Sequence, residues 1–114
     1  MRDERRIRLA WASDIHLDHA DPEAAAALCR RVRASGASAL LLGGDISVAP
    51  ALVADLELLA DAAGLPIRFV LGNHDYYGGS VTAVRQHLAA LDDPRLDWLD
   101  GTGWRELAPG VGLV

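Results

Sequence analysis

Apolar residues recur along this chain with two different periods, one typical of strands and one typical of helices. Alternating residues from Ile7 to Ser13 predict a first strand, and the apolar run Ala39–Leu42 predicts a second strand that flanking helices bury on both faces. A third strand is predicted over Ile67–Leu71. Apolar positions three or four residues apart predict helices over residues 22–34, 48–63 and 81–91.

Residues with known preferences for helix ends support these boundaries. Asp21 is a favourable N-cap before Pro22, and Ser80 is a favourable N-cap for the third helix. Gly64 is placed to end the second helix, because glycine readily adopts the left-handed conformation that often follows a helix. The hydrophobic pattern and the end signals therefore agree on three helices.

Three short segments follow the third helix, over residues 96–99, 104–108 and 111–114, with Gly-rich or Pro-Gly turns between them. Strands that alternate with helices predict an α/β fold, β-α-β-α-β-α-β, with a mostly parallel sheet and flanking helices. No repeat or low-complexity linker divides the chain, so we expect one domain over residues 1–114. The apolar ending at Leu113 and Val114 predicts that this domain is cut short.

The tryptophans and the single cysteine are expected in the core. Trp11 alternates with Ile7 and Leu9 on one face of the first strand, and Trp98 and Trp104 flank the last turn. Cys29 has no cysteine partner for a disulfide or a zinc cluster, so we expect a small buried side chain on the first helix.

The composition narrows the classes of function. The 114 residues include 11 arginines, no lysine and 16 acidic residues, which gives a net charge of −5 and argues against a nucleic-acid partner. No segment approaches the roughly 18 consecutive apolar residues of a membrane span. The N-terminus also lacks the features of a signal peptide, so we expect no membrane contact and a cytoplasmic location.

Polar side chains with ligand chemistry follow each of the first three predicted strands. Because the carboxyl ends of parallel strands meet at one edge of a sheet, we expect these side chains to converge on one crevice. The residues are Asp14 and His16 after the first strand, Asp45 after the second, and Asn73, His74 and Asp75 after the third.

These residue types match the ligands of manganese, iron or zinc. In an extended segment, Asp14 and His16 point to one side and can grip a metal together. Asp45 follows two glycines, and a carboxylate there can bridge two cations. Asn73 offers a neutral oxygen to the second cation. The alternative for each loop taken alone is an ordinary turn at a strand end.

Taken together, the three loops resemble the motifs of the calcineurin-like metallophosphoesterases. Asp45 follows Asp14 by 31 residues, and Asn73 follows Asp45 by 28 residues. The segments that carry the resemblance are Asp14-Ile15-His16, Gly43-Gly44-Asp45 and Gly72-Asn73-His74-Asp75.

The resemblance implies hydrolysis of a phosphate mono- or diester, in a small molecule or a phosphoprotein, at a centre of two divalent ions with a metal-bound hydroxide as nucleophile. It places Asp14, His16 and Asp45 on the first metal. The second metal takes Asp45 and Asn73. By the same resemblance, His74 contacts the phosphate or protonates the leaving oxygen, and Asp75 orients the imidazole.

The family fold is a four-layer α/β/β/α sandwich, and the resemblance implies that this chain is its first half. Family members supply two further histidine ligands later in a longer chain, one of them in a Gly-His-x-His segment. No Gly-His pair occurs here, and only His19 and His87 are spare histidines. We therefore also consider a catalytically incomplete module that binds one metal or a protein partner without turnover.

Two further expectations follow. An uncovered sheet face is expected to drive self-association of the chain. A receiver-like or nucleotide-binding α/β domain is a third alternative for the function, but the Gly-x-Gly-x-x-Gly and Walker-type phosphate loops are absent from the sequence.

Overall fold

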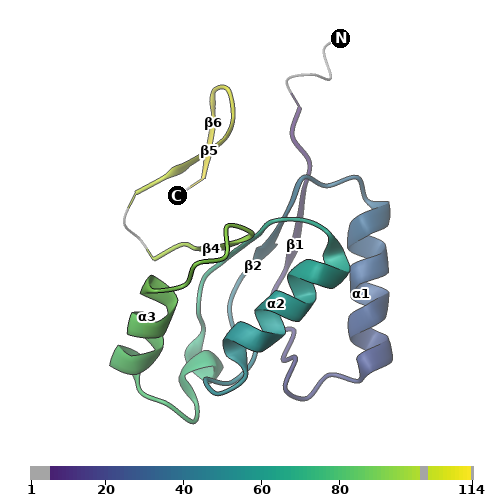
Figure 1. Cartoon of the computed structure of the whole chain (residues 1–114). Helices are drawn as coiled ribbons and strands as arrows, with labels where there is room; N and C mark the ends of the chain where they lie inside the picture. The colour runs from purple at the N-terminus through teal and green to yellow at the C-terminus, as the bar shows by residue number, and fades with distance from the viewer. Residues whose placement is uncertain (1–5, 101–102, 114) are drawn as a thin grey trace.

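The computed structural model describes residues 6–100 and 103–113, and its central element is a four-stranded parallel sheet (Figure 1). The strand order is β1-β2-β3-β4. The strands are β1 (Leu9–Ala12), β2 (Ala39–Leu42), β3 (Ile67–Phe69) and β4 (Leu96–Trp98). They are connected by α1 (Pro22–Ala34), by α2 (Leu52–Ala63), and by the 3-10 helix η2 (Asn73–Tyr76) with α3 (Val81–Ala89). This arrangement confirms the predicted α/β fold.

The residues predicted to cap the helix ends do so in the structure. The side chain of Asp21 accepts a hydrogen bond from the backbone N–H of Glu23 at 3.1 Å, and Ser80 accepts one from Ala83 at 3.0 Å. Gly64 ends α2 in the left-handed conformation, with φ of 68°. The third helix ends at Ala89, two residues before the predicted end.

The second helix begins at Leu52, four residues after the predicted start at Val48. Pro50 explains the difference. A proline disfavours the helical conformation of the residue before it, here Ala49, although the apolar spacing from Val48 onward fits a helix. The residues before Leu52 instead form a turn, in which Ala51 donates a hydrogen bond to the carbonyl of Val48 at 3.0 Å.

All three helices pack on the same face of the sheet. The strand register places Ala10, Leu40, Ile67 and Leu96 in one row and Ala12, Leu42, Phe69 and Trp98 in the next. These two rows contact one apolar core to which α1, α2 and α3 all contribute buried side chains. Cys29 of α1 belongs to this core, as predicted, and its burial raises the pKa of the thiol.

The opposite face of the sheet carries the row Trp11, Leu41, Arg68 and Asp97. Trp11 is 72% exposed, so the prediction that it lies in the core is wrong. Leu41 is only half-buried, so helices do not bury β2 on both faces as expected. The alternation in β1 was ambiguous because both of its faces carry apolar residues, and the small side chains of Ala10 and Ala12 pack toward the helices.

The last two strands form a separate antiparallel hairpin, β5 (Arg105–Ala108) and β6 (Val111–Leu113). The sequence predicts short segments here, over residues 104–108 and 111–114, without assigning them to a hairpin, and Val114 lies outside the described residues. The Nε atom of Arg105 donates to both carboxylate oxygens of Asp97 at 3.0 and 3.1 Å, which joins the hairpin to β4.

The remaining tryptophan predictions have different outcomes. Trp98 is half-buried against the core, where the guanidinium of Arg85 lies 4.8 Å from its ring centroid. Trp104 is 61% exposed and is not a core residue. Within the described part of the chain, no helix is long and apolar enough to cross a membrane.

Candidate metal centre

The loops that follow β1 and β2 stay paired beyond the ends of the strands. The backbone N–H of Asp14 donates to the carbonyl of Gly44 at 3.0 Å, and the N–H of His16 donates to the carbonyl of Asp45 at 3.1 Å. Leu17 continues the series to Ile46 at 2.7 Å. These bonds place the first two predicted ligand loops side by side, as the parallel topology predicts.

The backbone of three predicted ligands is in the left-handed region. Asp14, His16 and Asp45 have φ of 56°, 43° and 52°, and within the described residues they are the only non-glycine residues with positive φ. The prediction of an extended segment over residues 14–16 is therefore wrong. Short polar side chains tolerate this conformation better than most, but it still stores strain, and strain of this kind clusters at functional sites.

Two glycines allow the Asp45 loop and the Asn73 loop to approach each other closely. A Cβ atom added to Gly72 would lie 2.1 Å from Oδ1 of Asp45, and one added to Gly44 would lie 2.9 Å from the backbone nitrogen of Gly72. Gly44 also has φ of 104°, which side chains disfavour. The absence of side chains at Gly44 and Gly72 therefore lets the Asp45 loop and the Asn73 loop come into contact.

The convergence produces a cluster of His16, Asp45 and His74. Each of these residues offers one ligand atom, and the three atoms lie within 4.8 Å of one another. The rings of His16 and His74 meet edge to face with centroids 4.8 Å apart, and Nδ1 of His74 lies 3.3 Å from Oδ2 of Asp45. The sequence predicted that His74 contacts the substrate. The structure also places His74 beside side chains that can bind a metal.

The surroundings of Asp45 favour its charged form. Its Oδ1 accepts a hydrogen bond from the backbone N–H of His74 at 3.1 Å. This bond, aided by the charge of the His74 imidazole, holds the pKa of Asp45 below its usual range although partial burial opposes the effect. At neutral pH the cluster therefore contains a carboxylate beside two imidazoles.

The cluster fits a divalent cation. The Nδ1 atoms of His16 and His74 are both buried; that of His16 has no hydrogen-bond partner, and that of His74 lies 3.3 Å from Oδ2 of Asp45. A buried polar atom without a partner is uncommon, and a cation is one partner that would satisfy Nδ1 of His16. Two imidazoles and a carboxylate form a mixed nitrogen and oxygen donor set, which suits zinc, iron or manganese.

The other two predicted ligands lie at the edge of this cluster. Asp14 is exposed, accepts a hydrogen bond from the hydroxyl of Ser13 at 2.6 Å, and is close enough to Asp45 for the side chains to interact. Asn73 is exposed as well, and its Nδ2 donates to the hydroxyl of Tyr77 at 3.4 Å. Asp14 is not one of the three residues whose ligand atoms lie within 4.8 Å of one another.

Tyr77, which follows Asp75 by two residues, is a further neighbour of the cluster. Its ring centroid lies 4.5 Å from that of His74, with the planes tilted by 44°. It thus contacts both His74 and Asn73 from one side. No periodicity or spacing in the sequence distinguishes it from Tyr76, which instead packs against the core.

Asp75 is completely buried below the cluster, with 0% of its surface exposed. Its Oδ1 accepts hydrogen bonds from the backbone N–H groups of Ile46 and Ser47, both at 2.8 Å, and its Oδ2 accepts one from Gly72 at 2.9 Å. None of these donors is the imidazole of His74, so the orientation of that ring by Asp75 stays a prediction.

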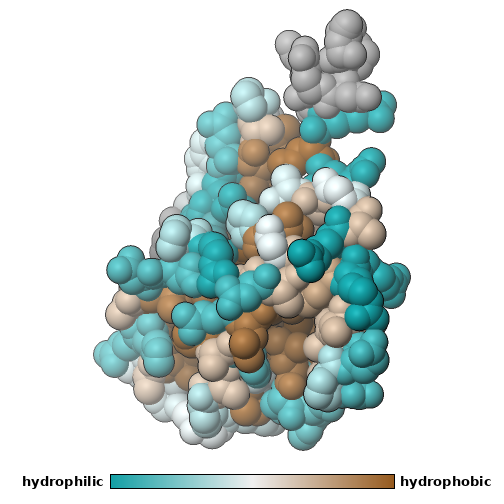
Figure 2. Space-filling view, turned by 45° about the vertical axis from the view of Figure 1, so that its right-hand side comes forward, coloured by the Kyte–Doolittle hydropathy of each residue, from teal (hydrophilic) through white to brown (hydrophobic). Residues whose placement is uncertain are grey.

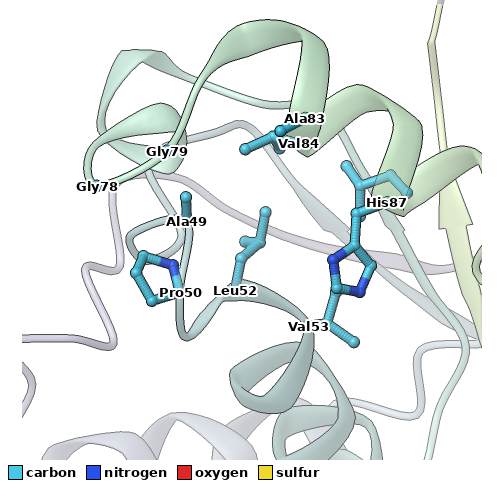
Figure 3. A pocket seen from close by; sticks show the side chains of 10 residues that line it. Ala49, Pro50, Leu52, Val53, Gly78, Gly79, Ala83, Val84 and His87 are labelled. Carbon is cyan, nitrogen blue, oxygen red and sulfur yellow. The ribbon is translucent and has the colours of Figure 1, made fainter.

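Two apolar surface hollows lie along α2. One, of about 190 Å³, separates α2 from α3, and Figure 3 shows His87 reaching from α3 toward Val53 of α2. Another, of about 400 Å³, lies between α1 and α2 on the side where hydrophobic side chains gather in Figure 2. Neither contains a predicted site residue. His19 is exposed, as expected for a histidine outside the site.

Comparison with known proteins identifies the class. A family model described as calcineurin-like phosphoesterase matches residues 7–114. The chain is 39% identical over 97 residues to the UDP-2,3-diacylglucosamine hydrolase of Stenotrophomonas maltophilia (strain K279a). That match covers 74% of this chain and 39% of the length of the relative. No solved structure matches significantly. The chain therefore belongs to the calcineurin-like phosphoesterase family, as its motifs indicate.

Proposed function

We propose that this chain supplies the metal-binding loops of a metal-dependent phosphoesterase. The observation that carries the proposal is the cluster of His16, Asp45 and His74, in which Nδ1 of His16 is buried without a hydrogen-bond partner. Membership of the calcineurin-like phosphoesterase family supports the same reaction class.

In this proposal, Asp14, His16 and Asp45 hold one divalent cation, and Asp45 and Asn73 share a second. Manganese, iron and zinc all suit this donor set. When bound, a pair of such cations neutralises the phosphoryl oxygens and lowers the pKa of water. Asp45 then keeps its charge because the N–H of His74 stabilises the carboxylate.

In this arrangement, His74 contacts both Asp45 and the substrate. Its Nδ1 faces Asp45 at 3.3 Å, so Nε2 is the ring atom that we assign to the substrate. There it contacts the phosphate or gives a proton to the leaving oxygen. The ring of Tyr77 packs on His74 and limits the orientations that the imidazole can adopt.

For the substrate, we propose a small molecule that contains a phosphate ester. The name of the relative from Stenotrophomonas maltophilia, UDP-2,3-diacylglucosamine hydrolase, supports a small molecule over a phosphoprotein. Acidic residues exceed arginines by 16 to 11, and this net negative charge disfavours a polyanionic macromolecule.

A second candidate is a module that binds one cation without turnover. In the described part of the chain, a single group of three or more acidic, histidine or cysteine side chains is arranged for a metal. The proposed second cation would have only Asp45 and Asn73 from this chain. Binding stoichiometry separates the candidates, because the enzyme needs two cations per chain and the module needs one.

The test is manganese-dependent hydrolysis of a chromogenic phosphate monoester and diester. We expect Mn²⁺ to activate hydrolysis by the wild type. Asp45→Asn should lower the rate at least 100-fold because it removes the charge shared by both cations. Asp92→Asn changes an exposed acidic residue in the segment between α3 and β4, is the matched control and should leave the rate unchanged.

Other outcomes decide against the proposal. Hydrolysis that needs no metal, or that survives in Asp45→Asn, would contradict it. One Mn²⁺ bound per chain together with no hydrolysis by the wild type would establish the second candidate instead.

A further inference from the structure

The two loops that carry Asp45 and His74 are joined below the metal cluster by the carboxylate of Asp75. Its Oδ1 accepts from two consecutive backbone N–H groups, those of Ile46 and Ser47, directly after Asp45. Its Oδ2 accepts from Gly72, two residues before His74. One buried side chain thus ties the turn after β2 to the turn after β3.

These bonds satisfy backbone groups that have no strand partner. Residues 46, 47 and 72 lie past the ends of their strands, where regular pairing has stopped. An N–H left buried without an acceptor is costly, and a charged acceptor makes a stronger bond than a neutral one. The charge of Asp75 is buried in the protein, and three N–H groups at 2.8 to 2.9 Å compensate it.

A second bond connects the same loops, but it uses a ligand of the proposed metal. Oδ1 of Asp45 accepts from the N–H of His74 at 3.1 Å. That carboxylate must also face a cation when the site is loaded. Asp75 is not a ligand of the proposed metal, so its hydrogen bonds hold the loops together whether or not a cation is present.

We propose that Asp75 is a positioning residue that sets the separation of Asp45 and His74 before any cation binds. The inference rests on the proposed metal site, and it assigns to Asp75 a task that does not involve the imidazole. Groups that orient metal ligands in this way typically change metal affinity by about 10- to 100-fold when they are removed.

The first test compares Asp75→Asn with the wild type, with Co²⁺ as the probe. Asparagine replaces one carboxylate oxygen by an NH₂ group, which in either orientation faces a backbone donor. We expect at least a tenfold weaker Co²⁺ affinity and a changed visible absorption spectrum of bound Co²⁺, measured where circular dichroism shows the variant folded. Unchanged affinity and spectrum would overturn the proposal.

The matched control is Asp93→Asn. Asp93 also accepts hydrogen bonds in a turn, from the backbone and side chain of Arg95, but it lies just before β4 begins at Leu96, away from the carboxyl ends of the strands. This variant should lose stability and keep the Co²⁺ affinity and spectrum of the wild type. An equal loss of affinity in Asp93→Asn would mean that general destabilisation explains the result, and this too would overturn the proposal.

The second test needs no variant and stays decisive if Asp75→Asn does not fold. In the metal-free wild type, we expect the amide protons of Ile46, Ser47 and Gly72 to be protected from hydrogen exchange to the same degree as those of β2. Fast exchange that becomes slow only when Co²⁺ is added would show that the cation, rather than Asp75, sets the separation of the loops.

The two proposals can fail separately. Absence of Co²⁺ and Mn²⁺ binding by the wild type would overturn the proposed function. Loss of amide protection in the metal-free protein would overturn the role of Asp75 while leaving the metal site in place.

Discussion

At the scale of single residues, backbone strain is concentrated on the ligands of the proposed metal site. Asp14, His16 and Asp45 all have positive φ. For a residue with a Cβ atom, this conformation costs about 1 to 2 kcal/mol relative to the right-handed region. Glycine would avoid that cost at each position but would supply no ligand. The fold therefore gives up stability where the site needs a carboxylate or an imidazole.

Substitutions at Asp14 test this strain. Asp14 is exposed, so its replacement leaves no cavity. Both Asp14→Ala and Asp14→Gly lose the carboxylate, but only alanine keeps the strained conformation. We expect Asp14→Gly to be about 1 kcal/mol more stable than Asp14→Ala in urea unfolding without metal. Equal stability of the two variants would contradict the left-handed conformation. Both should bind Co²⁺ more weakly than the wild type.

At the scale of elements, the site depends on how closely two turns can approach. The turns after β2 and β3 contact each other through glycine backbone at Gly44 and Gly72. Their separation is then held by hydrogen bonds to Asp75 and Asp45. The strands determine which turns meet, and the glycines determine how near they come.

Gly72→Ala tests the close approach. Its backbone is extended, with φ of −105°, so alanine is conformationally acceptable there. The added Cβ, however, would lie 2.1 Å from Oδ1 of Asp45 and must displace that carboxylate. We expect a loss of about 1 to 3 kcal/mol in stability, as for other overpacked sites, together with weaker Co²⁺ binding in a titration.

Gly64→Ala is the control for this experiment. Gly64 has positive φ, and no atom lies within 4 Å of an added Cβ. Alanine should therefore lower stability by about 1 kcal/mol through backbone conformation alone. Weaker Co²⁺ binding in Gly64→Ala, or unchanged binding in Gly72→Ala, would contradict the steric argument.

At the scale of the whole molecule, the two faces of the sheet differ. One face packs against three helices, and the other presents Trp11 and Leu41 together with the pair of Arg68 and Asp97, whose side chains form an ion pair at 2.5 Å. Trp11 is among the most exposed large apolar side chains of the described residues. Exposed apolar area of this kind favours association.

We therefore predict that the chain self-associates through this face. Light scattering or sedimentation should show a concentration-dependent increase in mass. Trp11→Arg should reduce that association. Leu58→Arg, which changes an exposed apolar residue of α2 on the helical side, should not. A wild type that stays monomeric at all concentrations would contradict the prediction.

Much of the fold was determined by local sequence. The N-caps at Asp21 and Ser80 and the C-cap at Gly64 act on their own helices, so their effects could be read without knowledge of the rest of the molecule. The order of strands and helices likewise predicted a parallel sheet with the three motif loops at one edge. Family membership followed from those same motifs.

The tertiary structure decided which face of β1 meets the helices, because apolar residues lie on both sides of that strand. It also decided the backbone of Asp14 and His16, which pairs with residues 44 and 45 and has positive φ in a segment that looks extended in sequence. The bonds of Asp75 join residues up to 29 positions apart. Local sequence determined which side chains are available for the site, whereas contacts between distant loops decided where each of them points.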